Sequence, residues 1–477
     1  MLHRVVLAPN DAVDIGHSDA GVGDRSETCL GGEGKNAAPR LPRELRGPDA
    51  NDGATIGQTP VIGVLTHLRV DNIISSIFTP PIDLLSSASF ATGQPHDQFR
   101  WLRENHPVYW HEEPDGPGFW AVTSYEGVHA VARDNALFSS EPTIMIRDTA
   151  GDGPLQPSMI NQDDPDHAAV RKLMADRFTP KAARELQPRL ERVASDIVDE
   201  MFDLGRCDLV ADVAGKMASY VGAELLGIPR EDSVALYRHV EMIHGVSDHQ
   251  SRQAVTEAQR ALAVYGDVVW QQKRARPADD LLSGLAHGEI NGRPIEESEF
   301  LANFGLLMSG SSDTTRNLIA GGMLTLLEHP DQLVALKADL DALLPVAVEE
   351  MLRWLSPVVH VRRTTTRDTV LCGQEIRKGD KVVIWYGAAN RDPRKFEDPE
   401  RFDITRRPNE HIAFGFGGHF CLGVHIGRLE GRAMFRQLLT RVTDLQLAGP
   451  VIWLDSTLVA GPMAAPISYS PRATVGV

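Results

Sequence analysis

One cysteine in a glycine-rich stretch constrains this chain more than any other feature. The stretch, residues 411–423, reads HIAFGFGGHFCLG and carries Cys421 near its end. Glycine adopts positive φ angles and lets a flat partner approach the backbone closely, and Phe414 supplies an aromatic face seven residues before the cysteine. A lone thiolate in this setting suits an axial ligand of haem iron. The plain alternative is a free cysteine that packs as a small buried hydrophobic residue.

The order of residues in this stretch favours the first interpretation. Phe414, Gly417, Cys421 and Gly423 form a Phe-x-x-Gly-x-x-x-Cys-x-Gly pattern, which resembles the haem-thiolate signature of the cytochrome P450 family. The resemblance implies that Cys421 is the proximal iron ligand and that the four residues bind haem b. It also implies a mainly α fold, in which a large helical domain and a smaller β-rich domain bury the haem between a distal and a proximal helix.

Composition excludes several other classes of protein. The chain has 477 residues, of which 42% are hydrophobic, so it can form a large core. Its formal net charge of -17 argues against nucleic-acid binding, because that function relies on clustered Lys and Arg. The four cysteines are far apart, so a secreted disulfide framework is not expected. No stretch approaches the roughly 18 apolar residues of a membrane span, and we expect a cytoplasmic protein.

The chain divides into two regions of different character. Residues 1–75 include a long stretch rich in Gly, Asp, Pro and Ser, which cannot bury enough apolar surface to offset the loss of backbone entropy. We expect a disordered tail there; the alternative is a start codon assigned too far upstream. Residues 76–477 are expected to form one haem domain.

Apolar periodicity predicts the elements of this domain. Two β-rich runs on either side of a turn signal predict a hairpin, at Pro107–His111 and Gly118–Thr123. Apolar residues at three- and four-residue spacing predict helices, at Leu186–Leu204, Leu209–Leu226, Phe300–Leu327 and Val346–Leu355. A second β-rich stretch covers residues 369–384. The sequence has no dinucleotide-binding fingerprint, so we expect electrons to come from a separate protein.

The helix predicted over Phe300–Leu327 contains a local conflict. Small and hydroxyl residues surround Asp313 and Thr314 in an otherwise apolar pattern, and such residues weaken a helix interior. The segment could be a helix crossing with Asp313 in a salt bridge. It also resembles the Ala-Gly-x-(Asp/Glu)-Thr motif of the P450 distal helix, with Gly310 and Ser311 departing from it. The resemblance implies that Thr314 holds water at the reaction centre and that Asp313, a carboxylate exchanging with solvent, relays protons to it.

Cationic residues that could hold the two haem propionates occur in three separate regions. His167 and Arg171 lie four residues apart, which on a helix is most often a solvated pair. The family resemblance instead makes them propionate partners, together with His419 and Arg363. Arg362 is an alternative to Arg363 for this role.

The resemblance also implies a structural cluster and a substrate pocket. Glu350 and Arg353 have the spacing of a surface helix pair, but they match a buried Glu-x-x-Arg of the family, which Arg401 would complete. The pocket would be apolar and would include Leu307, Gly310, Val358, Val359 and Leu458.

The function implied is a haem-thiolate monooxygenase, an oxidoreductase that inserts one atom of O2 into an apolar small molecule of the sterol, terpenoid or fatty acyl type. Its partners would be a ferredoxin and a ferredoxin reductase, which pass electrons from NAD(P)H to a monomeric enzyme. Two alternatives stay open: a peroxygenase or isomerase that needs no external electrons, and a non-catalytic haem-based sensor or carrier. The Asp313–Thr314 pair favours the use of O2.

Overall fold

The computed structural model describes residues 81–148, 157–202, 204–244 and 252–471. The tail expected over residues 1–75 lies outside these ranges. Within them, no helix has both the length and the apolar character that crossing a membrane requires.

Helices form the larger part of the structure. The α-helices are α2 (His96–Asn105), α3 (Tyr125–Arg133), α4 (Asp166–Ala175), α5 (Pro180–Met201), α6 (Gly215–Leu226), α7 (Arg230–His244), α8 (Arg252–Ala275), α9 (Leu281–Ala286), α10 (Glu297–Glu328), α11 (Pro330–Ala338), α12 (Leu340–Leu355), α13 (Tyr386–Ala389) and α14 (Val424–Arg441). Shorter helical segments are η2 (Ser87–Phe90), η3 (Met159–Asn161), η4 (Asp176–Phe178), η5 (Leu209–Ala214) and η6 (Gly417–His419).

The strands are short. They are β1 (Val108–His111), β2 (Phe119–Val122), β3 (Phe138–Ser139), β4 (Arg206–Asp208), β5 (Glu289–Ile290), β6 (Arg293–Pro294), β7 (His360–Thr365), β8 (Thr369–Leu371), β9 (Gln374–Ile376), β10 (Lys381–Trp385), β11 (Val442–Leu447), β12 (Ile452–Trp453), β13 (Pro462–Ala464) and β14 (Pro466–Pro471).

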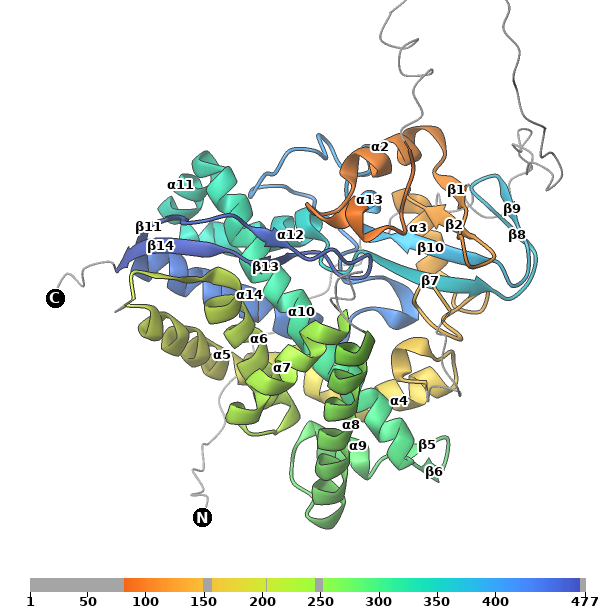
Figure 1. Ribbon diagram of the computed structural model, residues 1–477, viewed down its shortest axis with the longest axis horizontal. Coiled ribbons are helices and arrows are strands. Elements are labelled where there is room, and N and C mark those ends of the chain that lie inside the picture. The colour runs from red at the N-terminus through yellow and green to blue at the C-terminus, as the bar shows by residue number, and fades with distance from the viewer. Residues whose placement is uncertain (1–80, 149–156, 203, 245–251, 472–477) are drawn as a thin grey trace, which may run out of the picture.

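A five-stranded sheet with the order β1-β2-β10-β7-β3 forms the smaller, β-rich part of the fold (Figure 1). β1 and β2 pair antiparallel as the predicted hairpin, from Val108 opposite Val122 to His111 opposite Phe119. β10 runs parallel to β2 and antiparallel to β7. Each face of this sheet packs on its own buried apolar cluster, so the sheet is a rigid support for the segments beside it.

α10 is the central helix of the larger part (Figure 1). It contacts α6, α7, α8, α12 and α14, and its start is fixed by a capping box in which Glu296 and Glu299 satisfy each other's backbone N–H groups. The helix predicted over Phe300–Leu327 is therefore confirmed. The other predicted helices correspond to α5, to η5 with α6, and to α12.

Candidate active site

A cavity of about 290 Å³ lies between α10 and the stretch 411–423, which we call the cysteine loop. Its wall is mostly apolar. The lining side chains come from α10, the cysteine loop and several other segments, and include Met159, Leu226, Leu306, Leu307, Val358, Val361, Phe414 and Ile426. Cys421 lines the cavity from the loop, and Thr314 lines it from α10. The two motifs recognised in the sequence therefore border a single space.

Two glycines give the cysteine loop its shape. Gly415 and Gly417 both have φ of +74°, a left-handed conformation that side chains with a Cβ rarely adopt. A Cβ on Gly417 would also lie 2.3 Å from the backbone oxygen of Ala132 on α3, so the loop packs directly on another backbone. The turn closes through a hydrogen bond of 2.9 Å from the N–H of Cys421 to the oxygen of Phe414.

The Cys421 thiol sits in an environment suited to a metal-bound thiolate. Burial raises its pKa, while a hydrogen bond from the Gly423 N–H and the positive charges of Arg171 and Arg428 act in the opposite direction. Burial is the larger effect, so the free thiol stays protonated. A metal cation would reverse that balance, because a coordinating thiol is deprotonated.

Phe414 is the aromatic residue of the cysteine loop, and it lines the cavity. The Arg428 guanidinium stacks on its ring, 4.7 Å from the ring centroid, and is held there by two hydrogen bonds of 2.7 Å to the Glu349 carboxylate. The aromatic cover expected from the sequence is thus fixed from behind by an ion pair.

The four residues expected to hold propionates gather beside Cys421. His167, Arg171 and His419 line the cavity, and the rings of His167 and His419 lie 4.0 Å apart. Burial, Arg363, His167 and Arg171 together lower the pKa of His419 to about 3, which places the Arg363 charge in the same cluster. Within the described residues, the buried atoms His167 Nε2 and Arg363 Nε have no hydrogen-bond partner. His167 Nδ1 contacts Asp164 at 3.1 Å, but the two buried atoms without a partner fit the carboxylates of a haem.

The structure separates Arg363 from its alternative, Arg362. The Arg362 guanidinium forms an ion pair with Asp148, whereas the Arg363 guanidinium donates at 2.9 Å to the carbonyl oxygen of Arg362. Two neighbours of this cluster were not predicted. Ser140 contacts His419 Nε2 at 2.9 Å, and Tyr386 lines the cavity.

Thr314 and Asp313 do not face the same way. Thr314 lines the cavity, and its hydroxyl donates to the Gly310 carbonyl at 3.2 Å. Asp313 is only 1% exposed and pairs with His244 on α7 and with Arg316, whose Nη2 lies 3.2 Å from Oδ1. The salt bridge considered as an alternative for Asp313 is therefore present. Direct exchange of its proton with solvent, which the sequence led us to expect, does not fit this burial.

Three of the five predicted pocket residues line the cavity and two do not. Leu307, Gly310 and Val358 are part of its wall. Val359 is fully buried against the sheet instead, and its N–H donates to the Leu458 oxygen at 2.9 Å. Neither Val359 nor Leu458 is part of this cavity wall. Val359 faces away because it follows Val358, and consecutive residues of an extended segment point to opposite sides.

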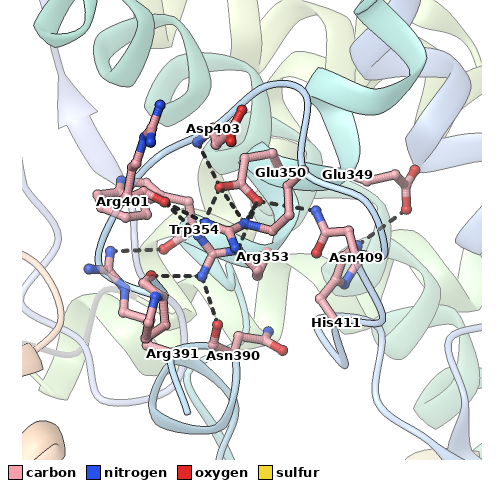
Figure 2. Close-up of polar contacts among 12 residues, drawn as sticks. Glu349, Glu350, Arg353, Trp354, Asn390, Arg391, Arg401, Asp403, Asn409 and His411 are labelled. Atoms are coloured by element: carbon pink, nitrogen blue, oxygen red, sulfur yellow. Dashed lines mark hydrogen bonds and ion pairs between the residues drawn. The ribbon is translucent and has the colours of Figure 1, made fainter. Parts of the chain in front are cut away.

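Glu350 and Arg353 form the buried cluster predicted from the sequence (Figure 2). Neither side chain has exposed surface. The prediction of Arg401 as the third cationic member was wrong: Arg401 contributes its backbone oxygen to Arg353, and its side chain is exposed. The guanidinium on Glu350 is that of Arg406, with Nε 3.1 Å from Oε2.

One further acid borders the cavity and was not predicted. Glu430 on α14 is buried, and burial raises its pKa well above the usual value, although a hydrogen bond with Thr315 partly opposes this. The only sequence signal for it was a single acid among the apolar residues of the helix after Cys421.

Comparisons with known proteins agree with this geometry. A family model described as Cytochrome P450 matches residues 225–443. The chain is 38% identical over 402 residues to the steroid C26-monooxygenase of Mycolicibacterium smegmatis. The match covers 83% of this chain and 98% of that protein. It is 35% identical over 380 residues to the linalool 8-monooxygenase of Pseudomonas putida, covering 76% and 93%.

Solved structures are similar over the same extent. The cytochrome P450 CYP268A2 of Mycobacterium marinum, solved with pseudoionone, superposes with a TM-score of 0.77 at 33% identity and covers 82% of this chain and 98% of that one. CYP109E1 of Bacillus megaterium, solved with testosterone, gives a TM-score of 0.72 at 32% identity and covers 80% and 99%.

Proposed function

The chain belongs to the cytochrome P450 family, and we propose that Cys421 and α10 provide the two walls of its haem site. The protein is a monooxygenase that acts on apolar substrates, and its cofactor is haem b. The observation that carries the proposal is that Cys421 and Thr314 both border one mostly apolar cavity.

Bound haem supplies the redox chemistry, in which one atom of O2 enters a C–H or C=C bond and the other becomes water, with uptake of two electrons and two protons. The residues of this chain hold that cofactor. Cys421 is the iron ligand, and Gly415 and Gly417 shape the loop that presents it. Arg171 and Arg363 offer guanidinium groups to the propionates, since that group matches a carboxylate best.

The propionate assignment is tested by a pair of neighbouring variants. Arg363→Ala removes the buried donor that has a free Nε, and Arg362→Ala removes a residue that is already paired with Asp148. We expect Arg363→Ala to lower the haem content of the purified protein more than Arg362→Ala does. Equal haem content in both variants would contradict the assignment of Arg363.

Thr314 is the residue that donates a hydrogen bond to water in the cavity and so passes protons into it. Its hydroxyl can leave the Gly310 carbonyl and donate to a water in the cavity, as threonine hydroxyls both donate and accept. Asp313 on the same helix turn is the group that would resupply it. Burial alone would raise the pKa of Asp313, but Arg316 and His244 outweigh burial and hold it below its usual value, so the resting form is the carboxylate.

The substrate would be a sterol, a terpenoid or a fatty acyl compound. The cavity wall is mostly apolar, and the names of similar proteins mention a steroid, linalool and a methyl-branched lipid. Titrating a panel of these compounds and following the spin-state change by difference spectroscopy would identify the class. No spectral change with any apolar compound, but a change with polar ones, would contradict it.

A ferredoxin, itself reduced by a reductase and NAD(P)H, would deliver electrons to a monomeric, cytoplasmic enzyme. Its docking face would lie behind Cys421, where Arg432 on α14 is partly exposed and Phe420 keeps 36% of its surface. Arg432→Glu should slow reduction by ferredoxin without changing substrate binding. An unchanged reduction rate would count against this face.

Peroxide-driven chemistry is the alternative to be excluded. Thr314 and Asp313 are both in place on α10, which favours O2 and external electrons. Product formation with ferredoxin, reductase and NAD(P)H should exceed product formation with peroxide alone. The reverse result would make the enzyme a peroxygenase, and no product with either system would favour a haem sensor or carrier.

A further inference from the structure

A ladder of polar side chains joins α7 to α10. Tyr237, Glu241 and His244 on α7 are spaced by four and three residues, so they share one face of that helix. The residues that they contact on α10 have the same spacing and run in the opposite order: Arg316, Asp313 and Ser309. All three α7 residues therefore meet a polar partner in an otherwise apolar helix contact.

The upper part of the ladder is a fixed ion cluster. Arg316 is 1% exposed and donates to the Tyr237 hydroxyl at 3.1 Å and to the Glu241 carboxylate. It also lies against Asp313. Arginine does not release protons in proteins, and burial raises the pKa of Tyr237 above its usual value. Neither residue can therefore resupply Asp313 with protons.

The lower part of the ladder has the geometry of a proton relay. His244 Nδ1 contacts Asp313 Oδ2, and His244 Nε2 lies 2.9 Å from the Ser309 hydroxyl. A carboxylate accepts a proton from Nδ1–H, while a serine hydroxyl can either donate to Nε2 or accept from it. Both the neutral and the charged ring are thus hydrogen-bonded without any change of position.

Exposure decides the direction in which protons travel. The Asp313 side chain is 1% exposed, whereas that of His244, the last residue of α7, is 15% exposed. We propose that His244 carries protons from solvent to Asp313, and that Ser309 positions its ring for this transfer. This inference rests on the proposed function, because it supplies the protons that Thr314 and Asp313 deliver.

Each transfer is balanced. The charged ring gives its Nδ1 proton to Asp313 Oδ2 and keeps the Nε2 proton that it donates to Ser309. The neutral carboxyl group, released from one charged partner, turns its O–H toward Thr314 and gives the proton to the water held there. Asp313 is then a carboxylate again, and the vacated Nδ1 of the ring takes up a proton from solvent, which restores the starting state.

The test is His244→Asn in the haem-loaded enzyme. The Asn amide N–H replaces Nδ1–H and keeps the hydrogen bond to Asp313, but an amide cannot carry a proton. We expect product formation to fall at least about tenfold, within the range for a lost acid–base group, and the solvent isotope effect on O2 consumption to rise. A rate within about twofold of wild type and an unchanged isotope effect would overturn the proposal.

Two controls separate this test from simpler causes. Tyr237→Phe removes a rung of the same helix contact without touching the relay, so its solvent isotope effect should match wild type. The reduced, CO-bound spectrum and substrate affinity of His244→Asn should also match wild type. A wild-type spectrum without the thiolate signature would contradict the proposed function. That result is distinct from a failure of the relay, which the His244→Asn variant tests.

A readout independent of turnover comes from nitrogen NMR of histidine-labelled protein in its diamagnetic reduced, CO-bound form. The Nδ1–H signal of His244 should shift in Asp313→Asn. If the ring turns away in Ser309→Ala, the Asp313→Asn substitution should no longer shift this signal in that background. No shift in Asp313→Asn would contradict the contact on which the relay depends.

Discussion

The Arg353 guanidinium donates two hydrogen bonds of 2.8 Å to the Glu350 carboxylate, and neither side chain reaches solvent. The same guanidinium donates at 2.9 Å to the backbone oxygen of Asn390. The side-chain oxygen of Asn390 in turn accepts from the N–H of Ile412 at 2.8 Å. Two steps thus link α12 to the start of the cysteine loop, which explains why a buried ion pair lies so far from the chemistry.

Arg353→Ala should destabilise the protein strongly. It would leave Glu350 buried with one cationic partner fewer, and breaking a buried pair in this way costs about 3–5 kcal/mol. Arg401→Ala is the matched control, because only the backbone oxygen of Arg401 takes part. Urea denaturation should show a large loss in the free energy of unfolding for Arg353→Ala and a change within about 0.5 kcal/mol for Arg401→Ala. Similar losses would restore a role for the Arg401 side chain.

Gly417→Ala should disrupt the cysteine loop more than conformational strain alone would. The new Cβ would meet the Ala132 backbone oxygen at 2.3 Å, and the residue has φ of +74°. Gly292→Ala is a control for strain, since Gly292 has φ of +82° and no atom within 4 Å of a built Cβ. The control should lose about 1–2 kcal/mol in the free energy of unfolding and keep its haem. Full haem content in Gly417→Ala would show that the loop can move away from α3.

Glu349 should contribute stability that depends on pH. Burial raises its pKa, but hydrogen bonds from His411 and Arg428 outweigh burial and lower it to about 2 from the ordinary 4.5. The folded form therefore binds fewer protons, so the contribution is complete above about pH 4.5 and is lost as the pH falls toward about 2.

Comparison with Glu349→Gln measures this contribution. After discounting for its partial exposure, we expect wild type to exceed the variant by about 2 kcal/mol in the free energy of unfolding near neutral pH, with the gap closing in acid. Asp341→Asn, which removes an exposed partner of Arg436, should change stability little at either pH. A gap for Glu349→Gln that stays constant with pH would contradict the charge pairing.

Thr314→Ala should uncouple electron use from product formation. The variant keeps the cavity wall but lacks the hydroxyl that would hold water there, so O2 would be reduced without oxidising the substrate. Thr314→Ser is the control, because it retains the hydroxyl. The ratio of product to NAD(P)H consumed should fall by about tenfold or more in Thr314→Ala and stay near wild type in Thr314→Ser. Full coupling in Thr314→Ala would remove the residue from the mechanism.

The sequence was most informative where function depends on local spacing. The cysteine loop, the acid–alcohol pair on α10 and the Glu350–Arg353 pair are each set by a few consecutive residues, and helical and strand periodicity placed the elements that carry them. The direction in which a helical side chain points also follows from its position in the sequence. Thr314 and Asp313 are adjacent on a helix, so they point about 100° apart, and only one of them lines the cavity.

Contacts between distant segments could not be predicted in this way. His244 meets Asp313 across 69 positions of sequence, and no local pattern marks that pairing before α7 is packed on α10. Arg406 replaced Arg401 for a similar reason: the chain turns after Arg401, which brings the later guanidinium onto Glu350. Side-chain direction in irregular segments is a tertiary property.

The reduced, CO-bound absorption spectrum reports directly on the ligand of the iron. Ligation by Cys421 predicts a Soret band with the red shift of a thiolate-ligated iron in the wild-type protein and the loss of that shift in Cys421→Ala. A wild-type Soret band without the red shift, or a red shift that persists in Cys421→Ala, would contradict the assignment of Cys421 as the iron ligand.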